Sequence, residues 1–495
     1  MQLKDLIAGA QALPNAERIS VAGPLDVEIT GITAEAPHVE RGFLYAAIPG
    51  GFKSGPERVP EAVAAGAAAL LLPLPEPGDI GVPPGLAVLR SANLRRALAF
   101  LSAALADVQP QTVVAVTGTS GKTSTTVFVR QLWTALGHRA ASIGTIGLFS
   151  PNWNCDVAIT TPHPFDLHPA LAFLVEDGVD HLALEATSQG LHQHRLDALS
   201  VSAAAFTNLS RDHLNYHGGM AEYFAAKQRL FADLLPPGAP AVVNADSDVA
   251  ETIIAIARRR GHRLIRTGSS GKEIRLVERE TVEGGQAITL DIFGRRASVT
   301  FPLTGPFQVE NLLVGLGLVI GTGGDIEQSV AAIANLSGVR GRLESVGTSS
   351  AGGDVYIDYA HKPAALEAVL TSLRAHTRGR LIVVFGCGGE TDPGKRPLMG
   401  AVATRLADRV VITDDNPRSE DPARIRAEIR ATAPDAVEIG DRQEAIRAAI
   451  AMLQSGDVLV IAGKGHETSQ ITAGVHQPFD DAAVARALLA EMPPR

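Results

Sequence analysis

The chain has 495 residues, of which 45% are hydrophobic and 20% charged, and its formal net charge at pH 7 is -9. Such a length and composition are typical of a globular protein with several domains, and we predict three. The net negative charge argues against nucleic acid as the main partner. No apolar run reaches the roughly 18 residues of a membrane-spanning helix. The stretch from Met1 to Ser20 lacks the apolar core of a signal peptide, and only two cysteines occur, so we expect a cytoplasmic protein.

Residues 1–109 are predicted to form a first, smaller α/β domain. The runs GFLYAAIPG and ALLLP read as buried strands, and EAVAAGAAA between them reads as a helix. A second helix is predicted from Leu94 to Asp107. The Gln109-Pro110 pair then marks the end of the domain.

Residues 110–338 are predicted to form a central α/β domain with a mainly parallel sheet. The β-branched run TVVAVTG opens it, followed at once by a glycine-rich turn and a helix. The strand-like runs HLALEA, AAAFTN and AVVNAD then alternate with helical stretches. Between Glu273 and Val299 the pattern changes to short alternating strands with glycine turns, which predicts an antiparallel flap or edge.

Residues 339–495 are predicted to form a third domain around a second α/β sheet. Its strands are expected at VYIDYA, RLIVVFG, RVVITDD and DVLVIAG, each with an alanine-rich helical stretch nearby. Sheets of this kind bind ligands at the carboxyl ends of their strands, so the loops there are the candidate binding loops.

The glycine-rich turn after the first central strand is a candidate phosphate loop. Its residues are Gly118, Thr119, Ser120, Gly121, Lys122, Thr123 and Ser124. The glycines let backbone N–H groups close on phosphates, and the following helix adds its positive dipole. Lys122 would contact the β- and γ-phosphates of ATP, and the Thr123 hydroxyl would hold Mg²⁺. Val116 stands where the usual P-loop has its first glycine, so the loop is a variant.

Two further clusters follow neighbouring strands of the central domain. Glu185 ends the run HLALE, where its carboxylate could take Mg²⁺. His213 and Lys227 belong to a segment rich in Asp, His and Tyr. Taken singly, each has a plainer explanation: a capping or ion-paired glutamate, a loop histidine, and a lysine on a solvated helix face. Their shared position beside the phosphate loop favours a joint site.

Three loops of the third domain carry charged residues directly after strands. They would bring Lys395, Arg396, Arg418, Lys464 and Glu467 to one sheet edge. Such a pocket suits a ligand with both carboxylate and ammonium groups, because arginine binds carboxylate through a two-pronged fork. Surface ion pairing is the alternative for any one of these residues.

The combination of these segments resembles the Mur ligase family, and within it the MurE-type members, which add diaminopimelate. The matching strings are TGTSGKTS, TTPHP, LEATSQGLHQHR, FTNLSRDHLNYHG, AAKQRLF, DYAHKPAAL, GCGGETDPGKRPLMG, DDNPRSEDP and AGKGHE. The resemblance implies an N-terminal UDP-sugar domain, a central P-loop-type ATPase and a C-terminal Rossmann-like amino-acid domain. It also implies the transfer of a phosphoryl group from ATP to the D-glutamate side chain of UDP-N-acetylmuramoyl-L-alanyl-D-glutamate. Meso-2,6-diaminopimelate would then attack the acyl phosphate, in peptidoglycan synthesis by a monomer.

The resemblance also implies roles for individual residues. Lys122, Glu185, His213 and Lys227 would be catalytic, and the last of these would be carbamylated. Magnesium ligands would come from Thr123, Glu185, His213 and Lys227. Asn311, Arg342, Asp358 and His361 would join the phosphate loop around ATP. The UDP-substrate would contact Thr160, Thr161, Thr187, Gln193 and Arg195. Diaminopimelate would contact Arg396, Asp415, Asn416, Arg418, Gly463 and Glu467, with Arg418 on the distal carboxylate that lysine lacks.

The chain departs from the family pattern mainly in the predicted uridine region. Glu35-Ala36-Pro37 replaces Asp-Ser-Arg, and the loop from Gly51 to Pro56 lacks a common acidic residue. Ile159, Thr187-Ser188-Gln189 and Gln308 also differ from the usual residues. Three alternatives therefore stay open: a Mur-type ligase for another amino acid, an enzyme like folylpolyglutamate synthase, or a nucleotide-binding paralogue without the sugar substrate.

Overall fold

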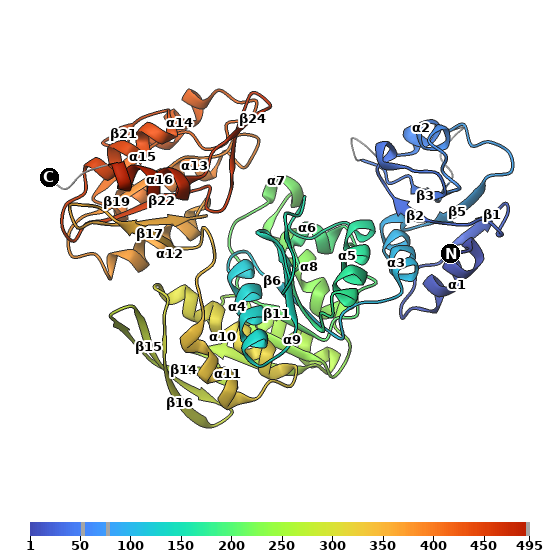
Figure 1. Cartoon of the computed structure of the whole chain (residues 1–495), viewed down its shortest axis with the longest axis horizontal. Coiled ribbons are helices and arrows are strands. Elements are labelled where there is room, and N and C mark those ends of the chain that lie inside the picture. Colours follow the sequence, from blue (N-terminus) through green and yellow to red (C-terminus); the bar gives the residue numbers. More distant parts are fainter. Residues whose placement is uncertain (51–54, 76–79, 492–495) are drawn as a thin grey trace.

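The computed structural model describes residues 1–50, 55–75 and 80–491. These residues form three α/β units in a row, and in Figure 1 the blue N-terminal unit and the orange-to-red C-terminal unit lie on opposite sides of the central one. The predicted fold class is therefore confirmed. No helix among the described residues has the length and apolar character needed to span a membrane. The boundaries at 109 and 338 stay predictions.

The N-terminal unit is a five-stranded sheet in the order β1–β5–β4–β3–β2, parallel except for β1. Its elements are α1 (Leu3–Ala12), β1 (Ser20–Ala22), β2 (Gly31–Thr33), β3 (Phe43–Ala46), α2 (Val59–Ala64), β4 (Ala69–Pro73), β5 (Ala87–Ser91) and α3 (Leu94–Ala106). The helix predicted from Leu94 is confirmed as α3, and the Asn93 side chain caps its first turn by accepting from the backbone N–H of Arg96. Residues 51–54 of the Gly51-to-Pro56 loop lie outside the described residues.

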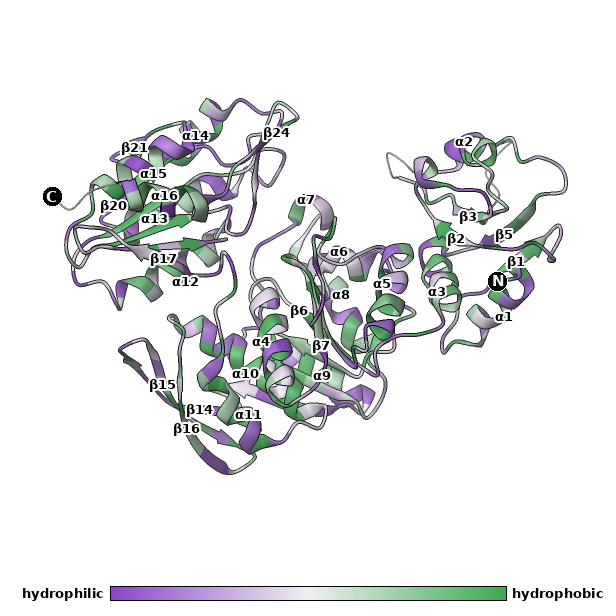
Figure 2. Ribbon diagram, in the orientation of Figure 1, coloured by the Kyte–Doolittle hydropathy of each residue, from purple (hydrophilic) through white to green (hydrophobic). Residues whose placement is uncertain are grey.

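The central unit has an eleven-stranded sheet in the order β16–β15–β14–β13–β12–β11–β6–β10–β7–β8–β9. Its strands are β6 (Thr112–Thr117), β7 (Ala140–Gly144), β8 (Gly147–Phe149), β9 (Asn154–Cys155), β10 (His181–Glu185), β11 (Ala203–Phe206), β12 (Pro240–Asn244), β13 (Arg263–Gly268), β14 (Ile274–Val282), β15 (Gly285–Ile292) and β16 (Arg295–Phe301). The run from β7 to β14 along the sheet is parallel. The predicted flap is confirmed as the antiparallel edge β14–β16, whose strands carry many hydrophilic residues in Figure 2.

Helices cover both faces of the central sheet because its strands are apolar on both sides. Val114 and Val116 of β6 pack with residues of α4 and α10, whereas Val113 and Ala115 pack with residues of α5 and α9. The helices are α4 (Lys122–Ala135), α5 (Pro164–Glu176), α6 (Ser188–His192), α7 (Leu214–His217), α8 (Met220–Arg229), α9 (Ala250–Arg260), α10 (Pro306–Gly321) and α11 (Ile326–Ala332). Burial on both faces is the usual condition of a parallel sheet.

The C-terminal unit has a six-stranded sheet in the order β17–β18–β22–β19–β20–β21, parallel except for β17. Its strands are β17 (Glu344–Thr348), β18 (Asp354–Asp358), β19 (Leu381–Phe385), β20 (Arg409–Ile412), β21 (Val437–Glu438) and β22 (Val458–Ala462), with a separate hairpin of β23 (Ser469–Thr472) and β24 (Val475–Pro478). One face packs on α12 (Pro363–Arg374), α13 (Lys395–Leu406) and α14 (Pro422–Arg430), and the other on α15 (Arg442–Ala451) and α16 (Asp481–Glu491).

Candidate functional site

The candidate phosphate loop joins the carboxyl end of β6 to the first turn of α4. Gly118 and Gly121 have φ values of +145° and +86°, which favour glycine. A Cβ on Gly118 would lie 1.9 Å from the Thr207 hydroxyl, and one on Gly121 would lie 2.1 Å from the Asn311 amide oxygen. The loop is therefore close-fitting, and it brings Asn311 of α10 to the predicted nucleotide position.

Residues after β11 hold the phosphate loop from the side. The Ser120 N–H donates to the Asn208 side chain at 2.9 Å, and the Thr207 hydroxyl donates to the Ser120 carbonyl at 2.7 Å. The sequence-based set of site residues missed both. Their signal was the position of FTN directly after a strand adjacent to β6.

Two lysine side chains meet beneath this loop. Lys122 Nζ donates to the carbonyls of Gly118 at 3.1 Å and Thr119 at 3.0 Å, and Lys227 Nζ donates to Gly118 at 2.7 Å. Burial lowers the pKa of Lys122 to about 8 and lowers the pKa of Lys227 well below its usual value. Two amino groups packed against one loop leave the region rich in positive charge, which suits bound phosphate.

Glu185 lies fully buried at the carboxyl end of β10. Its two carboxylate oxygens accept from the backbone N–H of Thr145 at 2.8 Å and from the Thr145 hydroxyl at 3.1 Å. Among the described side chains, no Lys, Arg or His nitrogen comes within 4.0 Å of this carboxylate. A buried carboxylate without an ion pair is unusual, and a cation would compensate it. Thr145 was not predicted, because it belongs to a short turn after β7.

The five residues predicted to contact the UDP-substrate form one connected group next to Glu185. The Thr161 hydroxyl donates to the Glu185 backbone carbonyl at 2.7 Å and accepts from the Thr187 N–H at 3.0 Å. Arg195 donates to the Thr161 carbonyl at 2.6 Å and to the Gln193 side chain at 2.8 Å.

The fifth member of the group joins it through the Glu185 contact. The Thr160 hydroxyl lies 3.2 Å from that of Thr145. The group therefore starts at the buried carboxylate and extends along the segment that follows α6.

His213 follows β11 and lies at the border with the C-terminal unit. It adopts the left-handed conformation with φ of 50°, and its Nε2 lies 3.1 Å from Asp212. The same carboxylate accepts from Lys362 of the C-terminal unit at 2.6 Å. The predicted metal residue is thus fixed beside a contact between two units.

Three predicted nucleotide residues approach the phosphate loop from the C-terminal side. Arg342 donates to the Thr123 hydroxyl at 3.1 Å and packs on the Tyr359 ring. The carboxylate of Asp358 accepts two backbone N–H groups, and burial raises its pKa to about 6. Nδ1 of His361 lies 2.8 Å from the Tyr359 carbonyl, and burial lowers the pKa of His361 well below its usual value.

The C-terminal loops bring together four of the six residues predicted for diaminopimelate. Asn416 donates to Glu467 at 2.8 Å, and Lys464 donates to both side chains at 2.9 and 3.1 Å. Gly463 has φ of +112°, and a Cβ there would lie 2.5 Å from the Asp415 carboxylate. These residues come from the loops after β20 and β22, as the pattern of loops predicted.

The two remaining residues of that set, both arginines, differ in what they contact. Arg396 is 1% exposed and pairs with Glu420 and Glu428, each at 2.8 Å. Arg418 donates to the Gly389 carbonyl and makes no ion pair within 4.0 Å of any described carboxylate. Arg418 is therefore available to bind an anion, whereas two carboxylates already neutralise Arg396.

Comparison with known proteins agrees with this arrangement. Residues 116–319 match the Mur ligase middle domain, and residues 341–465 match the Mur ligase glutamate ligase domain. The UDP-N-acetylmuramoyl-L-alanyl-D-glutamate–2,6-diaminopimelate ligase of Bradyrhizobium diazoefficiens is 49% identical over 99% of both chains. That of Caulobacter vibrioides is 49% identical over 92% of this chain and 95% of its own. A solved structure of a protein with the same name is 30% identical, covers 99% of both chains and has a TM-score of 0.69. The chain therefore belongs to the Mur ligase family and is an ATP-dependent ligase.

Proposed function

We propose that this protein adds meso-2,6-diaminopimelate to the D-glutamate side-chain carboxylate of UDP-N-acetylmuramoyl-L-alanyl-D-glutamate, at the expense of ATP, in peptidoglycan synthesis. The observation that carries the proposal is the convergence of three residue groups: the phosphate-loop lysines, the buried Glu185 and the Thr161–Arg195 group, all at the carboxyl edge of the central sheet. Relatives with that activity in their names match nearly the whole chain.

The chemistry needs a cradle for phosphate more than a covalent catalyst. The γ-phosphoryl group of ATP passes to the substrate carboxylate, and ADP leaves. The amine of diaminopimelate then attacks the acyl phosphate, and the amide forms as phosphate departs. Lys122 is placed to neutralise charge on the transferred group, because its amino group lies against the phosphate loop.

The donor set of the site fits magnesium. The residues that would hold it are Thr123, Glu185, His213 and a carbamylated Lys227. The fit rests on the Glu185 carboxylate, which is buried without an ion pair to any described residue. When bound, the metal would supply positive charge to the phosphate oxygens. We further propose that the enzyme acts as a cytoplasmic monomer.

Arg418 is our proposed reader of the distal carboxylate that distinguishes diaminopimelate from lysine. Its guanidinium has no carboxylate partner among the described residues, while Asn416 and Glu467 stand on the neighbouring loops. With lysine as substrate the guanidinium would stay unpaired, and leaving a polar group unpaired can reject an analogue by ~10³-fold or more.

The proposal is tested by measuring ATP turnover with the UDP-muramoyl dipeptide and each of a panel of amino acids. We expect turnover only with the dipeptide present and with diaminopimelate far above lysine. Arg418→Ala should lower kcat/KM for diaminopimelate by ~10²-fold or more and leave KM for ATP within about twofold. Arg418→Lys should restore little, because an ammonium cannot form the fork. ATP turnover independent of the dipeptide, or an alanine variant that still prefers diaminopimelate, would refute the assignment.

A further inference from the structure

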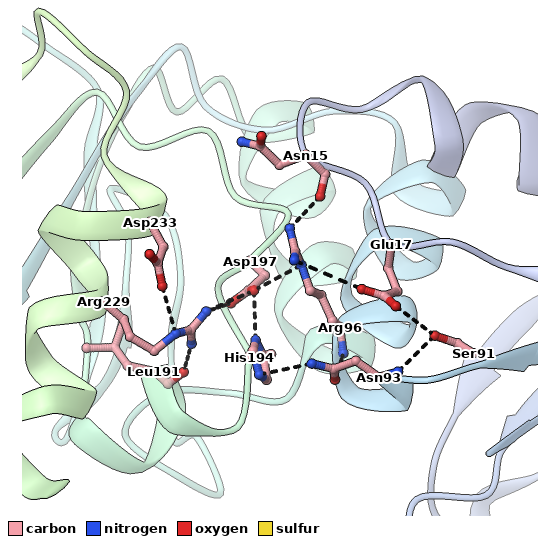
Figure 3. A network of polar contacts seen from close by, with 10 residues as sticks. All are labelled: Asn15, Glu17, Ser91, Asn93, Arg96, Leu191, His194, Asp197, Arg229 and Asp233. Atoms are coloured by element: carbon pink, nitrogen blue, oxygen red, sulfur yellow. Dashed lines mark hydrogen bonds and ion pairs between the residues drawn. The ribbon is translucent and has the colours of Figure 1, made fainter. Parts of the chain in front are cut away.

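A polar network joins the N-terminal unit to the central one around a single carboxylate, that of Asp197 (Figure 3). Its side chain is only 3% exposed. It lies 2.8 Å from Nδ1 of His194, 3.1 Å from the guanidinium of Arg229 and 3.5 Å from that of Arg96. Burial alone would raise the pKa of Asp197, but the hydrogen bond from His194 and the charge of Arg229 outweigh it and lower the pKa. Asp197 is therefore a buried anion.

On one side the network fastens the start of α3. Arg96 reaches Asp197 from the first turn of that helix and also donates to the Asn15 carbonyl. Asn93, which caps α3, lies 3.2 Å from Nε2 of His194, the ring that binds Asp197 through its other nitrogen. Two contacts from one helix end thus converge on one carboxylate.

Glu17 and Ser91 extend the same attachment deeper into the N-terminal unit. Glu17 lies 4.0 Å from the Arg96 guanidinium and accepts from the Ser91 hydroxyl at 3.1 Å. Ser91 ends β5, so the contact reaches the N-terminal sheet itself. The orientation of the unit thus depends on this contact as well as on apolar packing of Phe165 and Ala198 against its core.

On the other side the network fixes two parts of the candidate site. Asp197 follows Gln193 and Arg195 in the same turn, and these are the residues predicted to contact the UDP-substrate. Arg229 lies on α8, two residues after Lys227, and also donates to the Leu191 carbonyl at the end of α6. A displacement at Asp197 would be felt at both places.

We propose that Asp197 is a positioning residue that fixes the N-terminal unit relative to the Gln193–Arg195 turn. The two ends of the UDP-substrate can then be bound at the same time. The inference rests on the proposed function, because it assumes one ligand that bridges the two units. A bridging ligand gains affinity only when its two subsites keep the right spacing, so loosening the attachment weakens the whole ligand more than either fragment.

The test compares Asp197→Asn with the control Asp233→Asn in the full-length enzyme. Both changes remove a carboxylate from Arg229, but Asp233 is half exposed and pairs with Arg229 only. For Asp197→Asn we expect KM for the UDP-muramoyl dipeptide to rise about tenfold, with KM for ATP within about twofold. Asp233→Asn should change neither constant by more than about twofold. Arg96→Gln should reproduce the rise, and the double variant should add little to it.

A fragment separates positioning from a local structural role. UDP-N-acetylmuramate lacks the peptide carboxylate, so its inhibition constant should change less than about twofold in Asp197→Asn. An equal loss for fragment and whole substrate would overturn the inference, as would a fall in kcat with KM unchanged. If the wild-type enzyme failed to turn over ATP with the dipeptide, the proposed function itself would fail, whatever the variants did.

Discussion

The amino group of Lys227 lies 2.7 Å from the Gly118 carbonyl, buried beside the Tyr223 ring. Burial lowers its pKa well below the usual value, so an unprotonated amine is accessible near neutral pH. An unprotonated amine reacts with CO₂ to give a carbamate and a proton, and this converts a cationic side chain into an anionic metal ligand. The surroundings of Lys227 therefore favour the carbamylation that the family resemblance implied.

We predict that Lys227→Ala lowers kcat by ~10²-fold or more, because the site loses an anionic ligand beside the phosphate loop. Added formate or acetate should restore part of the activity by supplying a carboxylate in the space left. Chloride at the same ionic strength is the control, and steady-state ATP turnover is the measurement. An alanine variant with wild-type kcat would contradict the assignment.

At the scale of single residues, the sequence identified side chains that follow strands but not their partners. Glu185 was predicted because it ends a buried strand adjacent to the phosphate-loop strand. Thr145, which binds both Glu185 oxygens, and Asn208, which holds Ser120, were missed. Threonine and asparagine are common in any turn, so their type gives little signal until the sheet order places them beside the site.

At the scale of elements, long periodic segments were predictable and short ones were not. The helix from Leu94 and the buried strands β6, β10 and β22 follow from apolar runs with clear ends. The strands β1, β8, β9 and β21 have two or three residues each, too few to show a period. The ion pair of Arg442 and Asp481 was also missed, because it joins two helices 39 positions apart.

That ion pair is the basis of a stability prediction. Arg442 of α15 and Asp481 of α16 form two 2.7 Å contacts, and both side chains are 0% exposed. Asp481→Asn leaves a buried guanidinium without its anion, so we expect a loss of about 3–5 kcal/mol in the free energy of unfolding. The measurement is the denaturant midpoint of the full-length chain.

An exposed pair between the same two helices provides the matched control. Arg447 and Glu491 lie 3.5 Å apart with side chains 39% and 61% exposed. Glu491→Gln should cost less than about 1 kcal/mol, because water screens such pairs. Equal effects of the two substitutions would show that burial of the Arg442 pair has no energetic consequence.

At the scale of the whole molecule, the contacts between units could not be read from the sequence. Each joins residues far apart in the chain: Arg342 with Thr123, Lys362 with Asp212, and Arg211 with Asp392. Charged residues in loops have many possible partners, and only the arrangement of the units chooses among them. These contacts lie between the predicted nucleotide site and the C-terminal loops, so the relative position of the units affects the reaction.

Domain closure is the last prediction, and it follows from where the substrates must meet. Diaminopimelate is proposed to bind the loops around Asn416 and Glu467, whereas its target carboxylate is activated near Glu185 in the central unit. Attack on the acyl phosphate requires these groups to come together with water excluded, as closing domains commonly achieve. We expect a non-hydrolysable ATP analogue together with the UDP-muramoyl dipeptide to reduce the radius of gyration measured by small-angle X-ray scattering. Each ligand alone is the control and should give a smaller change, because each contacts fewer units. Identical scattering profiles with and without both ligands would mean that the C-terminal unit does not move to complete the site.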